Sequence, residues 1–212
     1  MKADKEPRKV VKEVPGAVLY SDGTILVKDV RLSYPHLGKA YESKDDDGND
    51  QKKFSLKGAF PKDRKEAMRL IKGEIDRVMK ENKAEDLASD RKFLRNGDDM
   101  GKPEFKGMYV ISASDSNRPH LRDRAAKKVE PESADRMFYG GCWANVLINP
   151  WWQNNKRGGK RVNANLSAVQ FVRDDEPFGT ERITDEDVDQ TFAPVGDGDS
   201  GFDDDDHDLD DL

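Results

Sequence analysis

The pattern of hydrophobic and polar positions along the chain predicts five β-strands. Alternating or continuous apolar residues, bounded by turn residues, mark each of them. The five segments are residues 24–34, 52–60, 107–114, 138–149 and 162–172. Pro35 ends the first segment and a polar turn at residues 43–50 leads to the second, so these two strands are expected to form a hairpin. If the first segment alternates strictly, one face of its strand carries Leu26, Lys28, Val30, Leu32 and Tyr34.

One amphipathic helix is predicted after Pro61. Asp63 is the predicted N-cap, and Glu66 three residues later completes a capping-box arrangement. Apolar residues then recur at three- and four-residue spacing, at Ala67, Leu70, Ile71, Ile75, Val78 and Met79. This stripe is expected to pack against the sheet, so it is a structural feature and not a binding site.

Five strands and one helix are the content of a small barrel. The OB-fold is a five-stranded barrel that binds oligonucleotides. The sequence therefore predicts a mainly β protein: a five-stranded OB-fold barrel with an inserted amphipathic helix and disordered termini. A chain of 212 residues suits one such domain, which we assign to residues 17–182. Residues 1–16 are predicted to be a flexible N-terminal arm, and residues 183–212 a disordered acidic C-terminal tail.

Charge is distributed very unevenly along the chain. Residues 183–212 contain thirteen Asp or Glu and no Lys or Arg, whereas residues 1–182 contain all 37 Lys and Arg and 30 acidic residues. The net charge of −6 thus combines a body of +7 with a tail of −13. A basic body with a polyacidic tail indicates a protein that binds a polyanion and carries its own competitor for it. The simpler alternative is a tail that only improves solubility.

Cysteine content and hydropathy exclude several classes of protein. A single cysteine, Cys142, forms no internal disulfide and favours a reducing compartment. The N-terminus lacks the apolar run of a signal peptide, and no segment approaches the ~20 apolar residues of a transmembrane helix. We therefore expect a soluble intracellular protein.

The segment 150–161 is the strongest candidate for a binding surface. Trp151 and Trp152 are neighbours on an extended chain and face opposite sides, so at least one of them is expected to be exposed. Four cations follow, at Lys156, Arg157, Lys160 and Arg161. Rings on which bases stack, beside cations that pair with phosphates, are what sequence-independent binding to single-stranded DNA needs. The alternative is that one Trp caps the barrel and the cations are merely solvated.

Further candidate DNA contacts are basic clusters and strand aromatics elsewhere in the body. A second basic cluster contains Arg118, Arg122, Arg124, Lys127 and Lys128. A third contains Lys52, Lys53 and Lys57. The aromatic residues that a barrel can expose on its binding face are Tyr34, Tyr109, Tyr139 and Trp143. The alternative for each is a solvated or packed side chain, and all of them rank below the two adjacent Trp.

Signals for an enzyme are weak. The histidines at positions 36, 120 and 207 are scattered, which argues against a catalytic triad or a zinc site. Asp99, Glu104 and Lys106 resemble the carboxylate-and-lysine half of a metal-dependent nuclease centre, which gives the alternative function of a nuclease acting on DNA. We expect no catalytic residue, no metal and no cofactor. A third alternative is an acidic-tailed interaction protein that never binds DNA.

The motifs at residues 30–37 and 158–179 resemble the bacteriophage single-stranded DNA-binding proteins that pair an OB-fold with an acidic C-terminal tail. The resemblance covers residues 24–180 and returns in the tail. It implies a protein that coats single-stranded DNA during phage DNA replication, recombination and repair in the cytoplasm of the infected bacterial host. Whether double-stranded DNA is also bound stays open.

The resemblance also assigns a role to the acidic tail, which would restrain DNA binding and contact replication or recombination proteins. The partner-binding segment would contain Phe202, Asp203, Asp204, Asp205, Asp206, Asp208, Leu209, Asp210, Asp211 and Leu212. Tails of this type often end in an aromatic residue. This chain ends in Leu212 instead, and Phe202 precedes the acidic run.

Overall fold

The computed structural model describes residues 8–44, 50–84, 86–156, 158–179 and 185–192. Contacts divide the chain into two units, Met1–Phe178 and Gly179–Leu212. In the described ranges, the first unit holds one nine-stranded sheet with the helices α1 (Lys65–Glu81) and α2 (Pro131–Met137). Within its described residues, the second unit holds the short helix α3 (Asp185–Thr191).

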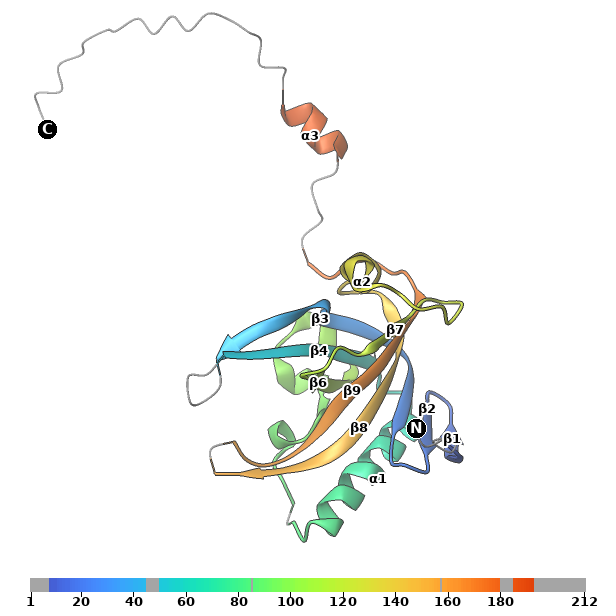
Figure 1. The fold of residues 1–212 in the computed structure, drawn as a ribbon, viewed down its shortest axis with the longest axis vertical. Coiled ribbons are helices and arrows are strands. Elements are labelled where there is room, and N and C mark those ends of the chain that lie inside the picture. The colour runs from blue at the N-terminus through green and yellow to red at the C-terminus, as the bar shows by residue number, and fades with distance from the viewer. Residues whose placement is uncertain (1–7, 45–49, 85, 157, 180–184, 193–212) are drawn as a thin grey trace, which may run out of the picture. The chain divides into compact units, whose positions relative to one another are not determined.

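Five long strands form most of the described sheet, as Figure 1 illustrates. They are β3 (Ile25–Lys44), β4 (Asp50–Pro61), β6 (Met108–Asp115), β8 (Trp143–Asn155) and β9 (Gly159–Arg173). Four short strands extend it, namely β1 (Val10–Val14), β2 (Ala17–Tyr20), β5 (Leu94–Asn96) and β7 (His120–Arg122). The hydrogen-bonded order is β5-β6-β4-β3-β8-β9-β7, with β2 also paired to β3 and β1 to β2. Among the described strands, only β7 runs parallel to a neighbour, β9.

Each of the five predicted segments overlaps one long strand, which confirms the mainly β fold class. The predicted end of the first strand at Pro35 is wrong, because β3 continues through Pro35 to Lys44. Strand β8 begins at Trp143 and extends to Asn155, into the segment that was expected to be a loop.

The order of the long strands, β6-β4-β3-β8-β9, is that of a partly open, five-stranded OB-fold barrel. Strands β6 and β9 lie near each other, and a parallel bridge joins Lys92 to Val162 at this seam. No continuous ladder among the described residues closes the sheet there. The barrel is therefore open on the side where β6 and β9 meet.

Strand β3 contains a bulge at Asp29 that the alternating pattern did not predict. Pairing with β8 shifts between Val27 and Val30, and Asp29 has a φ of 53°. The extra residue reverses the alternation, so the core receives Ile25, Val27, Val30 and Leu32. The Asp29 carboxylate accepts a hydrogen bond from Arg64 Nη2 at 2.8 Å, and Asn145 Oδ1 accepts one from its amide at 2.9 Å. These contacts hold the unusual backbone in place.

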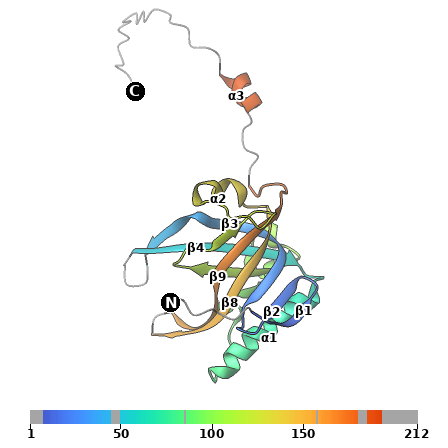
Figure 2. The ribbon, with the colours of Figure 1, turned by 45° about the vertical axis from the view of Figure 1, so that its right-hand side comes forward.

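Helix α1 covers the sheet beside β1 and β2 (Figures 1 and 2). All six residues of its predicted apolar stripe are buried, which confirms the packing role. The predicted capping box is wrong, because the helix begins at Lys65 with Arg64 as its N-cap and no side chain caps it. Arg64 instead donates hydrogen bonds to the carbonyls of Lys28 and Asp29, at 3.0 and 2.8 Å.

Both predicted terminal segments contain some regular structure. Residues 10–14 of the predicted flexible arm form β1 and pair with β2, and Glu13 of β1 forms an ion pair of 2.8 Å with Lys28 of β3. In the predicted disordered tail, residues 185–191 form α3. The partner-binding segment from Phe202 to the C-terminus lies outside the described residues. No helix in the described ranges is long and apolar enough to cross a membrane.

Candidate nucleic-acid interface

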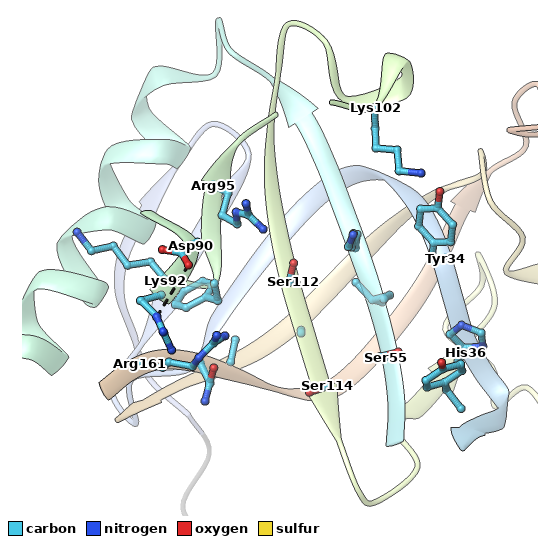
Figure 3. Close-up of a pocket in the computed structure, with 18 residues that line it drawn as sticks. Tyr34, His36, Ser55, Asp90, Lys92, Arg95, Lys102, Ser112, Ser114 and Arg161 are labelled. Atoms are coloured by element: carbon cyan, nitrogen blue, oxygen red, sulfur yellow. Dashed lines mark ion pairs between the residues drawn. The ribbon is translucent and has the colours of Figure 1, made fainter. Parts of the chain in front are cut away.

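A groove of about 540 Å³ crosses β3, β4, β6 and β9 (Figure 3). Its floor comes from the central pair β4 and β6, where Ser55 pairs with Ser114 and Lys57 with Ser112. Residues directly opposite each other in a ladder point to the same face, so these four side chains face the groove together. Three of them are serines. Small polar side chains leave the floor open and able to bond polar groups of a ligand.

Cations surround this floor. The groove is lined by six of them, Lys57, Arg91, Lys92, Arg95, Lys102 and Arg161, against one acid among its described lining residues, Asp90. Lys92 pairs with Asp86 at 2.7 Å, and Arg91 Nε lies 3.9 Å from Asp90. Within the described ranges Lys57, Arg95 and Arg161 pair with no carboxylate. Their charge is available to the phosphates of a bound strand.

Aromatic side chains of β3 form one side of the groove. Tyr34 is 50% exposed and Tyr41 is 54% exposed. The rings of His36 and Tyr41 are tilted, with centroids 5.2 Å apart. A hydrogen bond with Tyr34 raises the pKa of Lys102. Successive bases of a single strand stack on exposed rings of this kind, while neighbouring cations follow the phosphate backbone.

The two adjacent Trp have opposite roles in the β8–β9 hairpin. Trp151 pairs with Asn163, and Gln153 pairs with Arg161. Because opposite residues share a face, Trp151 lies on the same face as Arg161 and Asn163, which line the groove. It is 40% exposed, whereas Trp152 is half-buried and packs against the core. The expectation that they face opposite sides is confirmed, and Trp151 extends the aromatic surface beyond the groove.

Other predicted DNA contacts lie toward the ends of the β3–β4 and β8–β9 hairpins. Lys156 and Lys160 are exposed near the tip of the β8–β9 hairpin, while Arg157 lies outside the described residues. Lys53 is exposed opposite Tyr41 in the β3–β4 ladder. These lysines flank the groove on opposite sides but do not line it.

The second basic cluster does not line the groove. It lies just before, on and after β7, which pairs with residues 168–170 of β9 and not with the groove-lining part of that strand. The Arg118 guanidinium stacks 5.2 Å from the centre of the Phe54 ring, and Lys128 pairs with Glu130 at 2.9 Å. Arg122 donates to the carbonyl of Leu121, and Lys127 is exposed. This cluster is therefore partly committed to contacts within the protein.

Three predicted aromatic contacts are also elsewhere. Tyr109 packs beside Phe60, with ring centroids 5.8 Å apart. The Tyr139 hydroxyl donates to Asp174 at 3.0 Å, and Trp143 Nε1 donates to Asp175 at 2.6 Å. The bond from Trp143 lowers the pKa of Asp175. Tyr139 and Trp143 thus hold the chain after β9, and none of the three rings lines the groove.

The groove contains residues that the sequence analysis did not select: His36, Tyr41, Arg91, Lys92, Arg95 and Lys102. The four cations of this set all come from one polar stretch, residues 91–102, which shows no helix or strand periodicity. Phe93 donates its amide to the carbonyl of Val162 at 3.0 Å, and Arg91 donates to the carbonyl of Gly158 at 3.0 Å. These bonds bring the stretch to the groove. The high density of cations in this stretch could have marked it as a candidate DNA contact. The sequence does not show, however, that the stretch bonds to β9.

The nuclease alternative gains no structural support. Asp98, next to Asp99, forms an ion pair with Lys62 and accepts the amide of Gly107 at 2.7 Å. Asp99 accepts a hydrogen bond from Asn96. In the part of the chain that the structure describes, His, Cys, Asp and Glu form no group of three or more that could hold a metal ion.

Comparison with known proteins gives consistent matches. A family model described as "Enterobacter phage Enc34, ssDNA-binding protein" matches residues 23–207. The single-stranded DNA-binding protein from bacteriophage Enc34, solved in complex with ssDNA, is 40% identical with a TM-score of 0.75, covering 82% of this chain and 100% of that one. Another structure of that phage protein is 38% identical with a TM-score of 0.74, covering 86% and 99%.

A curated relative comes from a second phage. It is the putative protein p50 of Acyrthosiphon pisum secondary endosymbiont phage 1, 29% identical over 164 residues, which cover 73% of this chain and 85% of the relative.

Proposed function

The chain belongs to the family of the Enterobacter phage Enc34 ssDNA-binding protein, and we propose that it binds single-stranded DNA in the groove across β3, β4, β6 and β9. The family is one of binding proteins and not of enzymes. The observation that carries the proposal is the groove itself, where six cations and exposed rings border a polar floor. Such a surface recognises a flexible polyanion with bases.

The groove supports binding that depends little on base sequence. Lys57, Arg95 and Arg161 neutralise phosphates and release counterions. Exposed rings at both ends of the path, Tyr34 on β3 and Trp151 on β8, stack on bases, and every base has a π-face. Phosphate contacts position the strand without reading its sequence.

The biological role that we propose is the coating of single-stranded DNA in phage DNA replication, recombination and repair. The protein would act in the cytoplasm of the infected bacterial host, where phage DNA is copied. Family membership and the similarity to a phage protein solved with ssDNA support this role.

The acidic tail supplies the proposed regulation. Its thirteen acidic residues and lack of basic ones make it a polyanion tethered to a basic body. A tether keeps the effective concentration of such a competitor high, so the tail would compete with DNA for the groove. The same tail would recruit replication or recombination proteins through its acidic residues and the apolar Phe202, Leu209 and Leu212.

Fluorescence anisotropy with labelled single-stranded and double-stranded DNA of one sequence tests the proposal. We expect tight binding of the single strand, little dependence on its sequence, and an intact oligonucleotide after incubation with magnesium. Failure to bind single strands at low salt would contradict the function. Magnesium-dependent cleavage would revive the nuclease alternative.

A further inference from the structure

Tyr34 has a backbone conformation that bulky side chains rarely adopt. Its φ is 49°, in the left-handed region, where an aromatic residue is an outlier. It lies within β3, and the ladder with β4 shifts register between Ser33 and His36. Strained residues of this kind persist where the surroundings or a function require them, and they cluster at ligand clamps.

The other described non-glycine residues with positive φ each have a local structural reason. Lys83 follows the C-terminal end of α1. Ala126 lies in a tight turn, where its amide bonds the carbonyl of Asp123 at 3.0 Å. Asp29 forms ion pairs with Arg64 and Arg173. Turns explain the positions of Lys83 and Ala126, and ion pairing at the bulge explains that of Asp29.

Tyr34 also lies at a shift in strand register, but its side chain lines the groove and contacts two lysines instead of packing in the core. Half of its side chain is exposed. Its ring contacts two ammonium groups, with Lys57 Nζ at 5.3 Å and Lys102 Nζ at 5.7 Å from the ring centroid. Buried Leu32 and Ser33 precede it in β3, so the local turn of the backbone moves the next side chain out of the core. The strain therefore presents the ring at the edge of the groove (Figure 3).

We propose that Tyr34, Lys57 and Lys102 form a subsite for one nucleotide of the bound strand. The base stacks on the Tyr34 ring, and the adjoining phosphate pairs with the two ammonium groups. The Lys57 Nζ also lies 5.7 Å from the centroid of the Phe105 ring, and Phe105 is buried. This inference rests on the proposed function, because it places one nucleotide within the same groove.

Substitution of Tyr34 by residues that tolerate positive φ separates function from folding. Tyr34→Gly and Tyr34→Asn remove the strain together with the ring. We expect an unchanged or raised melting temperature for both variants. Loss of one stacked base should weaken binding of single-stranded DNA by about 5- to 150-fold. Tyr34→Phe keeps the ring and should bind nearly as tightly as the wild type.

An oligonucleotide without bases identifies which part of the nucleotide each residue contacts. On an abasic single strand, Tyr34→Gly should bind as the wild type does, because there is no base to stack. Lys57→Ala and Lys102→Ala should weaken binding to abasic and ordinary strands by similar factors, because their contact is the phosphate.

Several results would overturn the subsite. If the wild type binds single-stranded DNA and Tyr34→Gly binds equally well, the subsite is wrong while the proposed function stands. If both strain-relieving variants melt at clearly lower temperature, Tyr34 is a structural residue. A Tyr34→Gly effect of equal size on abasic DNA would also exclude stacking. If the wild type binds no single strand, the proposed function itself fails.

Discussion

Salt dependence of binding gives the most quantitative prediction from the groove. Lys57, Arg95 and Arg161 line it and pair with no carboxylate among the described residues. For single strands, each neutralised phosphate contributes about −0.7 to the slope of log affinity against log salt. Replacing all three with Met should therefore flatten the slope by about 2. Between about 50 and 200 mM salt, the wild type should then lose about 20-fold more affinity than the variant.

A matched variant controls for the change in net charge. Replacing Arg122, Arg124 and Lys127 with Met also removes three positive charges, but these residues lie outside the groove. Anisotropy titrations of all three proteins at several salt concentrations give the slopes. We expect the control to keep nearly the wild-type slope. A control that flattens the slope as much as the groove variant, or a groove variant that leaves it unchanged, would refute the assignment of these phosphate contacts.

Three further predictions concern the paired Trp, the tail and the cysteine. Trp151→Ala should lose about 1–3 kcal/mol of single-strand binding at an unchanged melting temperature, whereas Trp152→Ala should lose about 2 kcal/mol of unfolding free energy in a denaturant titration. The opposite pattern would exclude Trp151 as a platform. Removing residues 202–212 should tighten DNA binding, most at low salt, where the Debye length grows to about 30 Å at 0.01 M; equal affinities at every salt concentration would exclude competition by the tail. Burial raises the pKa of Cys142 to about 12, so its thiol should react with a thiol reagent at neutral pH only after denaturation, and fast reaction in the native protein would contradict that burial.

The long elements were predictable from the sequence because their periodicity extends over many residues. Strand β9 and helix α1, for example, each carry a pattern long enough to distinguish strand from helix. Strands β5 and β7 have three residues each, too few to show a period, and their pairing depends on tertiary contacts. The bulge at Asp29 was equally hidden, because ion pairs with distant arginines stabilise it.

The candidate site was predictable only in part. Local chemistry identified Tyr34, Lys57, Arg161 and Trp151, since aromatic residues and cations of strands stand out in the sequence. The part of the chain around Lys92 and Arg95 reaches the groove through its bond to Val162 of β9 and through the pairing of β5 with β6, and no local pattern encodes that approach. Charge density alone also selected the cluster near β7, which the fold places elsewhere. Position in the sheet, and not charge, decides which cations meet a ligand.

Photo-crosslinking tests the central claim, that single-stranded DNA occupies this groove, most directly. A single-stranded oligonucleotide carrying photoreactive bases would be irradiated in complex with the full-length protein, and the attached peptides identified by mass spectrometry. We predict crosslinks on β3 around Tyr34 and Tyr41 and on β8 at Trp151. Crosslinks concentrated at Tyr139, Trp143 or the segment after β7, with none in the groove, would contradict the account.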